Sequence, residues 1–177
     1  MTGNGQRYTA FMIVGNGKAA DVWATTERIM ELIDRYPDRL MKVLSSADAV
    51  RAGKAGKMGV IFSIEGPAKW LEGRIETLHI LYRLGIREMS ITHGEGGSDP
   101  ASLQGTPSPY RPCTAGEREE ERRKAAGLTS FGREVLKAQN ELGIVTDVSH
   151  INDKAFFEVM ERTTKPPISS HTNAAGL

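Results

Sequence analysis

Short apolar runs alternate with longer amphipathic stretches along most of this chain. The run "MGVIFSI" at 58–64 is apolar at neighbouring positions, which is typical of a strand buried on both faces of a parallel sheet. The longer stretches carry apolar residues three and four positions apart, the period of a helix with one buried face. The pattern predicts strands at 7–14, 58–64, 86–92, 144–149 and 167–170, and amphipathic helices at 20–36, 45–56, 69–85, 130–143 and 153–164.

Strands that alternate with helices indicate successive βα units and therefore a parallel sheet. A length of 177 residues suits one domain or a piece of a larger one, and no internal boundary is evident. The stretch 94–116 is rich in Gly, Pro and Ser and has no periodicity. A connection of this length inside a compact domain is usually functional or mobile. The sequence therefore predicts a single α/β domain over 1–177 with one long loop.

Composition narrows the range of functions. The net charge is +1, and no basic stripe with interleaved aromatic residues occurs, so we expect no nucleic-acid partner. The charged run at 116–127 mixes both signs, which indicates a solvent-exposed helix. Cys113 is the only cysteine and lies in a Pro-rich loop, which excludes an internal disulfide and gives no reason to expect a catalytic thiol.

No apolar run reaches the roughly 18 residues that a membrane-spanning helix needs. The opening "MTGNGQRYTA" also lacks the basic start and apolar stretch of a signal peptide. The compartment stays open between the cytoplasm and the periplasm or extracellular space.

Polar side chains follow four of the predicted strands at the point where each strand ends. Glu65, His93, His150 and His171 come directly after 58–64, 86–92, 144–149 and 167–170. Because the carboxyl ends of parallel strands meet at one rim, these side chains are expected to lie close together. Imidazoles and a carboxylate are a common ligand set for zinc, copper, iron and nickel.

Each of these residues also has a plainer explanation. A histidine after a strand is often a hydrogen-bonded loop residue, and Glu65 before Gly66-Pro67 could simply begin a turn. His79 lies in the middle of the predicted helix 69–85, and we interpret it as structural. The loop after His93, "GEGGSD", offers Glu95 and Asp99 as further acidic candidates. The coincidence of four strand ends nevertheless favours a metal site.

A competing motif occurs near the start of the chain. Gly15, Gly17 and Ala20 match the G-x-G-x-x-A pattern, in which glycines let a backbone approach a pyrophosphate at a helix N-terminus. That fingerprint needs a second strand ending in Asp or Glu after the helix. Here the only strand-like piece, "LMKVLS", ends on serine. The glycines are better explained as a strand-to-helix turn.

Three segments together resemble the membrane dipeptidase (renal dipeptidase) family of zinc metallopeptidases. They are "GVIFSIEGPAKWLEGRIETLHILYRLGIREMSITH", "GLTSFGREVLKAQNELGIVTDVSHINDKAFFEVM" and "PPISSHTNA", and the similarity runs from about residue 20 to the end. The pattern from "GLTSFGREV" to "DVSH" is the most specific part. The resemblance implies a (β/α)8 barrel of the amidohydrolase type, with two zinc ions at its carboxyl rim.

The resemblance also implies residue roles. Glu65 matches the carboxylate that bridges both metals, and His150 and His171 match the histidines of the second metal. His93 matches the histidine that binds and polarises the substrate carbonyl. Asp147 matches an acidic position that orients ligand imidazoles. The implied substrate is a small dipeptide, and a homodimer is one assembly compatible with the family.

The chain departs from the family pattern in several places. The family's His-x-Asp pair for the first metal has no counterpart, since no histidine precedes His79. The last-strand aspartate and the arginine for the substrate carboxylate are also absent, and the sequence after His93 is not Asn-rich. A full barrel needs roughly 250 residues. We therefore expect a partial barrel of about five strands that is weak or inactive alone, and the alternative is a non-catalytic α/β protein that binds a metal or ligand.

Overall fold

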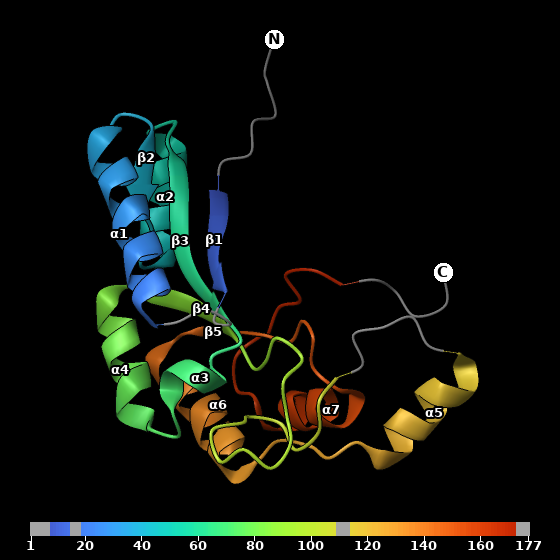
Figure 1. Cartoon of the computed structure of the whole chain (residues 1–177). Coiled ribbons are helices and arrows are strands. Elements are labelled where there is room, and N and C mark those ends of the chain that lie inside the picture. The colour runs from blue at the N-terminus through green and yellow to red at the C-terminus, as the bar shows by residue number, and fades with distance from the viewer. Residues whose placement is uncertain (1–7, 15–18, 109–113, 173–177) are drawn as a thin grey trace.

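The computed structural model describes residues 8–14, 19–108 and 114–172. Its centre is one parallel sheet, in which β1, β3, β4 and β5 lie side by side in that order and β2 also pairs with β3 (Figure 1). The strands are β1 (Tyr8–Val14), β2 (Leu40–Lys42), β3 (Met58–Glu65), β4 (Ile86–Ser90) and β5 (Val145–Asp147). Parallel pairing throughout confirms the α/β class predicted from the alternating pattern.

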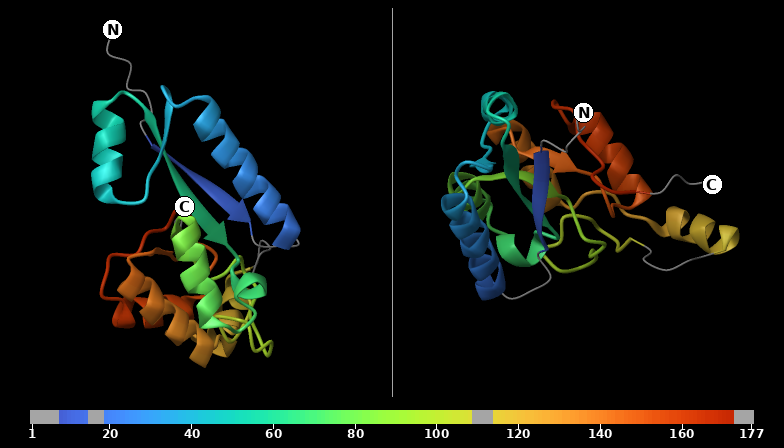
Figure 2. Two further views of the ribbon diagram at one scale, coloured as in Figure 1. Left: turned by 90° about the vertical axis from the view of Figure 1, so that its left-hand side faces the viewer. Right: turned by 90° about the horizontal axis from the view of Figure 1, so that it is seen from above.

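Helices connect the strands and cover the sheet (Figure 2). Most begin at a side chain that caps the first turn, such as Thr129 before α6 and Asn152 before α7, each of which accepts a backbone N–H. The helices are α1 (Ala19–Arg35), α2 (Ser46–Lys54), α3 (Ala68–Leu71), α4 (Ile75–Leu84), α5 (Ala115–Lys124), α6 (Ser130–Leu142) and α7 (Asp153–Arg162). Within the described ranges, no helix combines the length and the apolar character that crossing a bilayer requires.

The core lies between the outer face of the sheet and helices α4, α6 and α7. Its fully buried side chains come from the strands and from the inward helix faces that the periodicity predicts. They include Val60, Phe62, Ile64, Leu71, Leu78, Leu81, Met89, Ile91, Leu136 and Val159. By contrast, no side chain of α5 is buried, as expected for the charged run at 116–127.

The strand register determines which side chains share a face of the sheet. Ser63 lies beside Glu88, and Ser90 lies beside Asp147. Because side chains alternate along a strand, Glu65 projects to the same face as Ser63. This face, opposite to the packed helices, is polar and leads to the carboxyl ends of the strands.

The structure differs from the predicted elements in four places. The predicted helix 69–85 is two helices, α3 and α4, because Glu72 and Gly73 adopt left-handed backbone conformations with φ of 48° and 69°. The predicted strand 167–170 is a single parallel bridge between Ile168 and Asp147. The loop predicted over 94–116 ends where α5 begins at Ala115. The start of the strand-like sequence "LMKVLS", at Leu40–Lys42, forms an additional strand, β2.

Candidate metal centre

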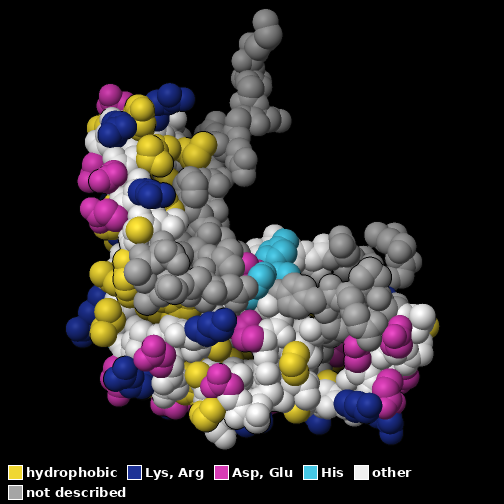
Figure 3. All heavy atoms as spheres, in the orientation of Figure 1, with side chains coloured by type: hydrophobic (Ala, Val, Ile, Leu, Met, Phe, Trp, Pro, Cys, Tyr) yellow, Lys and Arg dark blue, Asp and Glu magenta, His cyan; other side chains and the backbone are white. Residues whose placement is uncertain are grey.

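The elements of the sheet bring Glu65, His93, His150 and His171 together. Glu65 is the last residue of β3 and is only 4% exposed. His93 follows β4, His150 follows β5, and His171 follows the Ile168 bridge. Figure 3 shows a group of histidine side chains in the angle between the upright and the horizontal part of the molecule.

Glu65 lies at the centre of this group. Its Oε1 is 2.9 Å from Nε2 of His150 and 3.3 Å from Nε2 of His171. Its Oε2 is 3.7 Å from Nε2 of His93. One carboxylate oxygen therefore faces two histidines and the other faces the third.

The two Nε2 atoms of His150 and His171 are only 2.6 Å apart. Together with Glu65 Oε1 they form a group of three donor atoms that all lie within 4.8 Å of one another. Neighbouring ligands of a tetrahedral zinc ion, with bonds of about 2.0–2.1 Å, lie roughly 3.3 Å apart. The three atoms would need to separate by less than about 1 Å to hold such an ion, so their chemistry and spacing fit a metal.

The electrostatics of the centre favour a cation. Glu65 Oε1 is buried, and no hydrogen bond of normal geometry reaches it despite the two nearby rings. A buried acceptor without a donor is costly. Burial lowers the pKa of His150, partly opposed by the negative charge of Glu65, and the neighbouring His171 and His93 lower it further. A neutral imidazole is the form that binds a metal.

Asp147 lies behind the centre, where it holds the two serines that precede His150 and His171. Its Oδ1 accepts hydrogen bonds from the backbone N–H and hydroxyl of Ser149, at 3.0 and 2.8 Å, and from the backbone N–H of Ser170 at 3.1 Å. Its Oδ2 accepts from the hydroxyl of Ser170 at 2.6 Å. These contacts hold the backbone at the residue directly before His150 and at the residue directly before His171.

The loop after β4 is tied to the segment that follows His150. The side chain of Gln104 donates to the carbonyl of Glu95 at 3.0 Å and accepts from the backbone N–H of Asn152 at 3.0 Å. Asn152 donates in turn to the carbonyls of Thr106 and Ala126, at 3.0 and 3.1 Å. The sequence analysis identified neither Gln104 nor Asn152. The position of Asn152 directly before a predicted helix indicates an N-cap, but no pattern in the sequence marks Gln104.

The remaining candidates from the sequence lie in different places. Glu95 accepts the backbone N–H of His93 at 2.6 Å, so it supports the loop beside the centre. Asp99 is exposed and accepts the backbone N–H of Ala101. His79, interpreted from the sequence as structural, is exposed on α4 and is not one of the four residues of the centre. Gly15, Gly17 and Cys113 lie outside the described residues.

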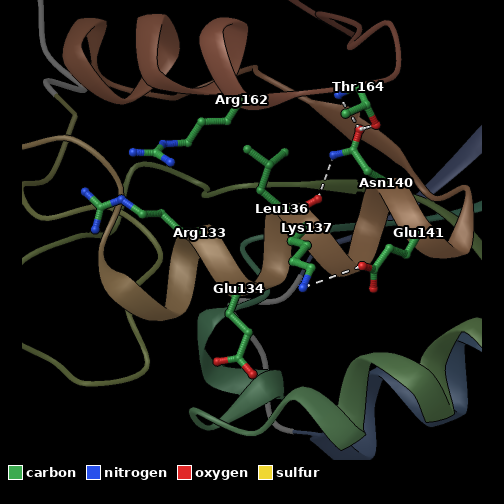
Figure 4. Close-up of a pocket in the computed structure, with 8 residues that line it drawn as sticks. All are labelled: Arg133, Glu134, Leu136, Lys137, Asn140, Glu141, Arg162 and Thr164. Atoms are coloured by element: carbon green, nitrogen blue, oxygen red, sulfur yellow. Dashed lines mark hydrogen bonds and ion pairs between the residues drawn. The ribbon is translucent and has the colours of Figure 1, made fainter.

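Of two surface grooves, one adjoins the metal centre and the other lies away from it. One of about 970 Å³ adjoins it, with His150 in its wall beside apolar Val148, Ile151, Phe156 and Phe157. The other, of about 840 Å³, lies between α6 and α7 and contains none of the four centre residues (Figure 4).

The arginines of the second groove are already paired. Its two arginines, Arg133 and Arg162, both bind the same oxygen of Glu158, at 2.6 and 2.8 Å. Asn140 uses its carbonyl oxygen to accept the backbone N–H of Thr164 (Figure 4). This groove therefore lies at the junction of α6 and α7, where Glu158 and Thr164 already engage its arginines and Asn140.

A parallel βα sheet with carboxylate and imidazole groups at its carboxyl ends is the arrangement expected of the barrel-type metal-dependent hydrolases. The sequence model of one family, membrane dipeptidase (peptidase family M19), matches residues 3–177. The chain belongs to the membrane dipeptidase family.

Similar proteins agree with this assignment. The chain is 28% identical over 160 residues to an uncharacterized Klebsiella pneumoniae protein in the pqqA 5' region, covering 88% of this chain and 53% of that protein. It is 27% identical over 151 residues to the dipeptidase tcpJ of Claviceps purpurea, covering 85% of this chain and 31% of that protein. The chain thus spans about half or less of the length of these relatives.

Solved structures show the same fold. A Rhodobacter sphaeroides metallopeptidase, liganded with a phosphinate mimic of the dipeptide L-Ala-D-Ala, superposes with a TM-score of 0.73 at 21% identity over 92% of this chain and 43% of that chain. A structure described as the dipeptidase AC, a metallopeptidase of the same family, gives a TM-score of 0.77 at 20% identity, covering 94% of this chain and 50% of that chain. The chain is therefore a partial (β/α) barrel.

Proposed function

We propose that this chain carries the second-metal half of a dipeptidase active site. In this proposal Glu65, His150 and His171 hold a zinc ion, and His93 binds the carbonyl of a dipeptide. The observation that carries the proposal is the convergence of Glu65 Oε1 with the two Nε2 atoms, 2.9 and 3.3 Å away, around a buried oxygen that lacks a hydrogen bond.

A zinc ion held there would polarise a peptide carbonyl and bring the pKa of a bound water toward 7. The chain's own residues would position the substrate and stabilise the charge that develops on its carbonyl oxygen. His93 is one quarter exposed and its Nε2 lies on the Oε2 side of Glu65, so it can donate a hydrogen bond to a carbonyl oxygen as negative charge develops there. In a complete family site Glu65 would also help to hold the second ion, as the family resemblance implies.

The groove beside His150 supports a small peptide as the ligand. Its volume of about 970 Å³ and its apolar walls suit a molecule with hydrocarbon parts, and the Arg122–Asp153 ion pair, at 2.5 Å, and Lys154 supply polar groups at its edge. A dipeptide has this character, and it would place its scissile bond next to the centre.

We expect the isolated chain to hydrolyse dipeptides slowly. The family's His-x-Asp pair for the first metal has no counterpart, since no histidine precedes His79. A single ion can polarise a carbonyl, but the symmetrical clamp of a two-metal site is then missing. A turnover number in the usual enzyme range of roughly 1–1,000 per second would contradict this expectation.

Binding of a phosphinate dipeptide mimic tests the proposal without requiring turnover. Isothermal titration calorimetry would compare the zinc-loaded chain, the same chain with chelator, and the zinc-loaded His93→Ala variant, with His79→Ala as the matched control. We expect binding that needs zinc, weakens at least tenfold in His93→Ala, and is unchanged in His79→Ala. Zinc uptake without any phosphinate binding would instead support a non-catalytic metal-binding protein.

A further inference from the structure

The hydroxyl of Ser170 contacts three polar groups, and their chemistry determines where its hydrogen points. It lies 2.6 Å from Asp147 Oδ2, 2.8 Å from His171 Nδ1 and 3.3 Å from the hydroxyl of Ser149. Asp147 is fully buried, and four hydrogen bonds reach its two oxygens, the arrangement of an ionised carboxylate that only accepts. The single hydrogen of Ser170 therefore belongs to the short bond with Asp147.

Ser149 does not compete for that position. Its own hydroxyl donates to Asp147 Oδ1 at 2.8 Å and accepts the backbone N–H of His171 at 3.2 Å. With both serine hydrogens directed at Asp147, the lone pairs of Ser170 are left for His171. A hydroxyl oxygen that already donates elsewhere can only accept from Nδ1.

We propose that Ser170 is a positioning residue that relays the charge of Asp147 to His171 and fixes that ring as the Nδ1–H tautomer. A neutral imidazole carries one N–H, so a proton on Nδ1 leaves the lone pair on Nε2. This lone pair faces Glu65 Oε1 at 3.3 Å and His150 Nε2 at 2.6 Å. The relay thus presents His171 as a ready metal ligand before any ion arrives. It deepens the proposed function, on which its metal-binding consequence rests.

The relay would let a buried residue, Asp147, orient an exposed one, His171. His171 is about half exposed, whereas Asp147 is fully buried. An exposed ring without such support would rotate and exchange tautomers, and zinc binding would then cost the free energy of selecting one form. Ser170 removes that cost through two short hydrogen bonds.

Nuclear magnetic resonance of the metal-free chain tests the tautomer directly. Long-range ¹H–¹⁵N correlation at about pH 8, above the ordinary histidine pKa of about 6.5, distinguishes a proton on Nδ1 from one on Nε2. We expect His171 to be the Nδ1–H form in the wild type and in Ser170→Thr, which keeps the hydroxyl, and a mixture of both forms in Ser170→Ala. A wild-type His171 with its proton on Nε2 would overturn the relay.

Zinc titration of the same variants supplies the second measurement. We expect Ser170→Ala to weaken zinc binding roughly tenfold or more, while Ser170→Thr and the exposed neighbour control Ser169→Ala stay within about threefold. Wild-type zinc affinity in a folded Ser170→Ala variant would overturn the relay. If Ser170→Ala does not fold, the tautomer of the wild type and of Ser170→Thr still decides.

The two proposals fail in distinguishable ways. A wild-type chain that binds no zinc but has the Nδ1–H tautomer of His171 contradicts the proposed function alone. A chain that binds zinc with His171 in the other tautomer when metal-free contradicts the relay alone.

Discussion

Replacement of Asn152 should both destabilise the protein and loosen the metal centre. Asn152 is 5% exposed and caps α7 by accepting the backbone N–H of Ala155 at 2.9 Å. Its amide nitrogen donates to the carbonyls of Thr106 and Ala126, at 3.0 and 3.1 Å. It also lies two residues after His150, which holds a left-handed backbone conformation with φ of 60°.

The magnitude follows from these contacts. Loss of an N-cap costs about 1 kcal/mol, and carbonyls left without donors cost roughly 1–3 kcal/mol. We therefore expect Asn152→Ala to lower the free energy of unfolding by about 2–4 kcal/mol, or the midpoint of thermal unfolding by roughly 5–12 °C. Weaker zinc binding should accompany it because the backbone after His150 loses its anchor.

Two matched variants separate the cap from the loop contacts. Asn152→Asp keeps the capping oxygen but faces both carbonyls with an acceptor, so it should lose most of the stability that Asn152→Ala loses. Thr114→Ala removes the exposed cap of α5 and should cost about 1 kcal/mol or less. Thermal unfolding followed by circular dichroism measures all three. An Asn152→Asp variant as stable as the wild type would refute the reasoning.

Three further results are expected. Burial raises the pKa of Glu88, with a further contribution from the charge of Asp147; the ionised carboxyl therefore destabilises the fold above its unfolded pKa of about 4.3. Glu88→Gln should accordingly raise the unfolding midpoint at pH 7 but not at pH 4, and an equal gain at both would contradict this cause. Gly132→Ala should prevent stable folding, because the added Cβ would overlap the carbonyl oxygen of Leu103. Gly116→Ala lies on exposed α5, where a Cβ has open space, and should raise the free energy of unfolding by about 0.5–1 kcal/mol. Urea unfolding of both glycine variants measures this difference, and equal effects would be inconsistent with the close packing.

The position of the centre could be predicted from the sequence because it depends on topology. Once the strands are parallel, residues directly after them meet at one edge, which brings Glu65, His93, His150 and His171 together without knowledge of any side-chain contact. The family and the partial barrel followed from motifs around the same residues; the family comparison confirms the first, and the similarity to solved structures confirms the second. The assignment of these residues as metal ligands stays a prediction.

The supporting contacts could not be predicted in this way. Gln104 meets Asn152 across 48 positions, and Ser170 meets Asp147 across 23. Serine, asparagine and glutamine occur in many loops, so only the folded backbone reveals which of them bind one another. Two local errors have simpler causes. Gly73 permits the break between α3 and α4, and Pro166 and Pro167 lack the N–H groups needed to extend the bridge at Ile168 into a strand.

Zinc binding by the purified chain tests the central claim most directly. Equilibrium dialysis with metal analysis would compare the wild type with the His150→Ala/His171→Ala double variant, and His79→Ala on exposed α4 serves as the control. The account predicts that the wild type and His79→Ala retain zinc and that the double variant loses it. Equal zinc content in the wild type and the double variant would contradict the account.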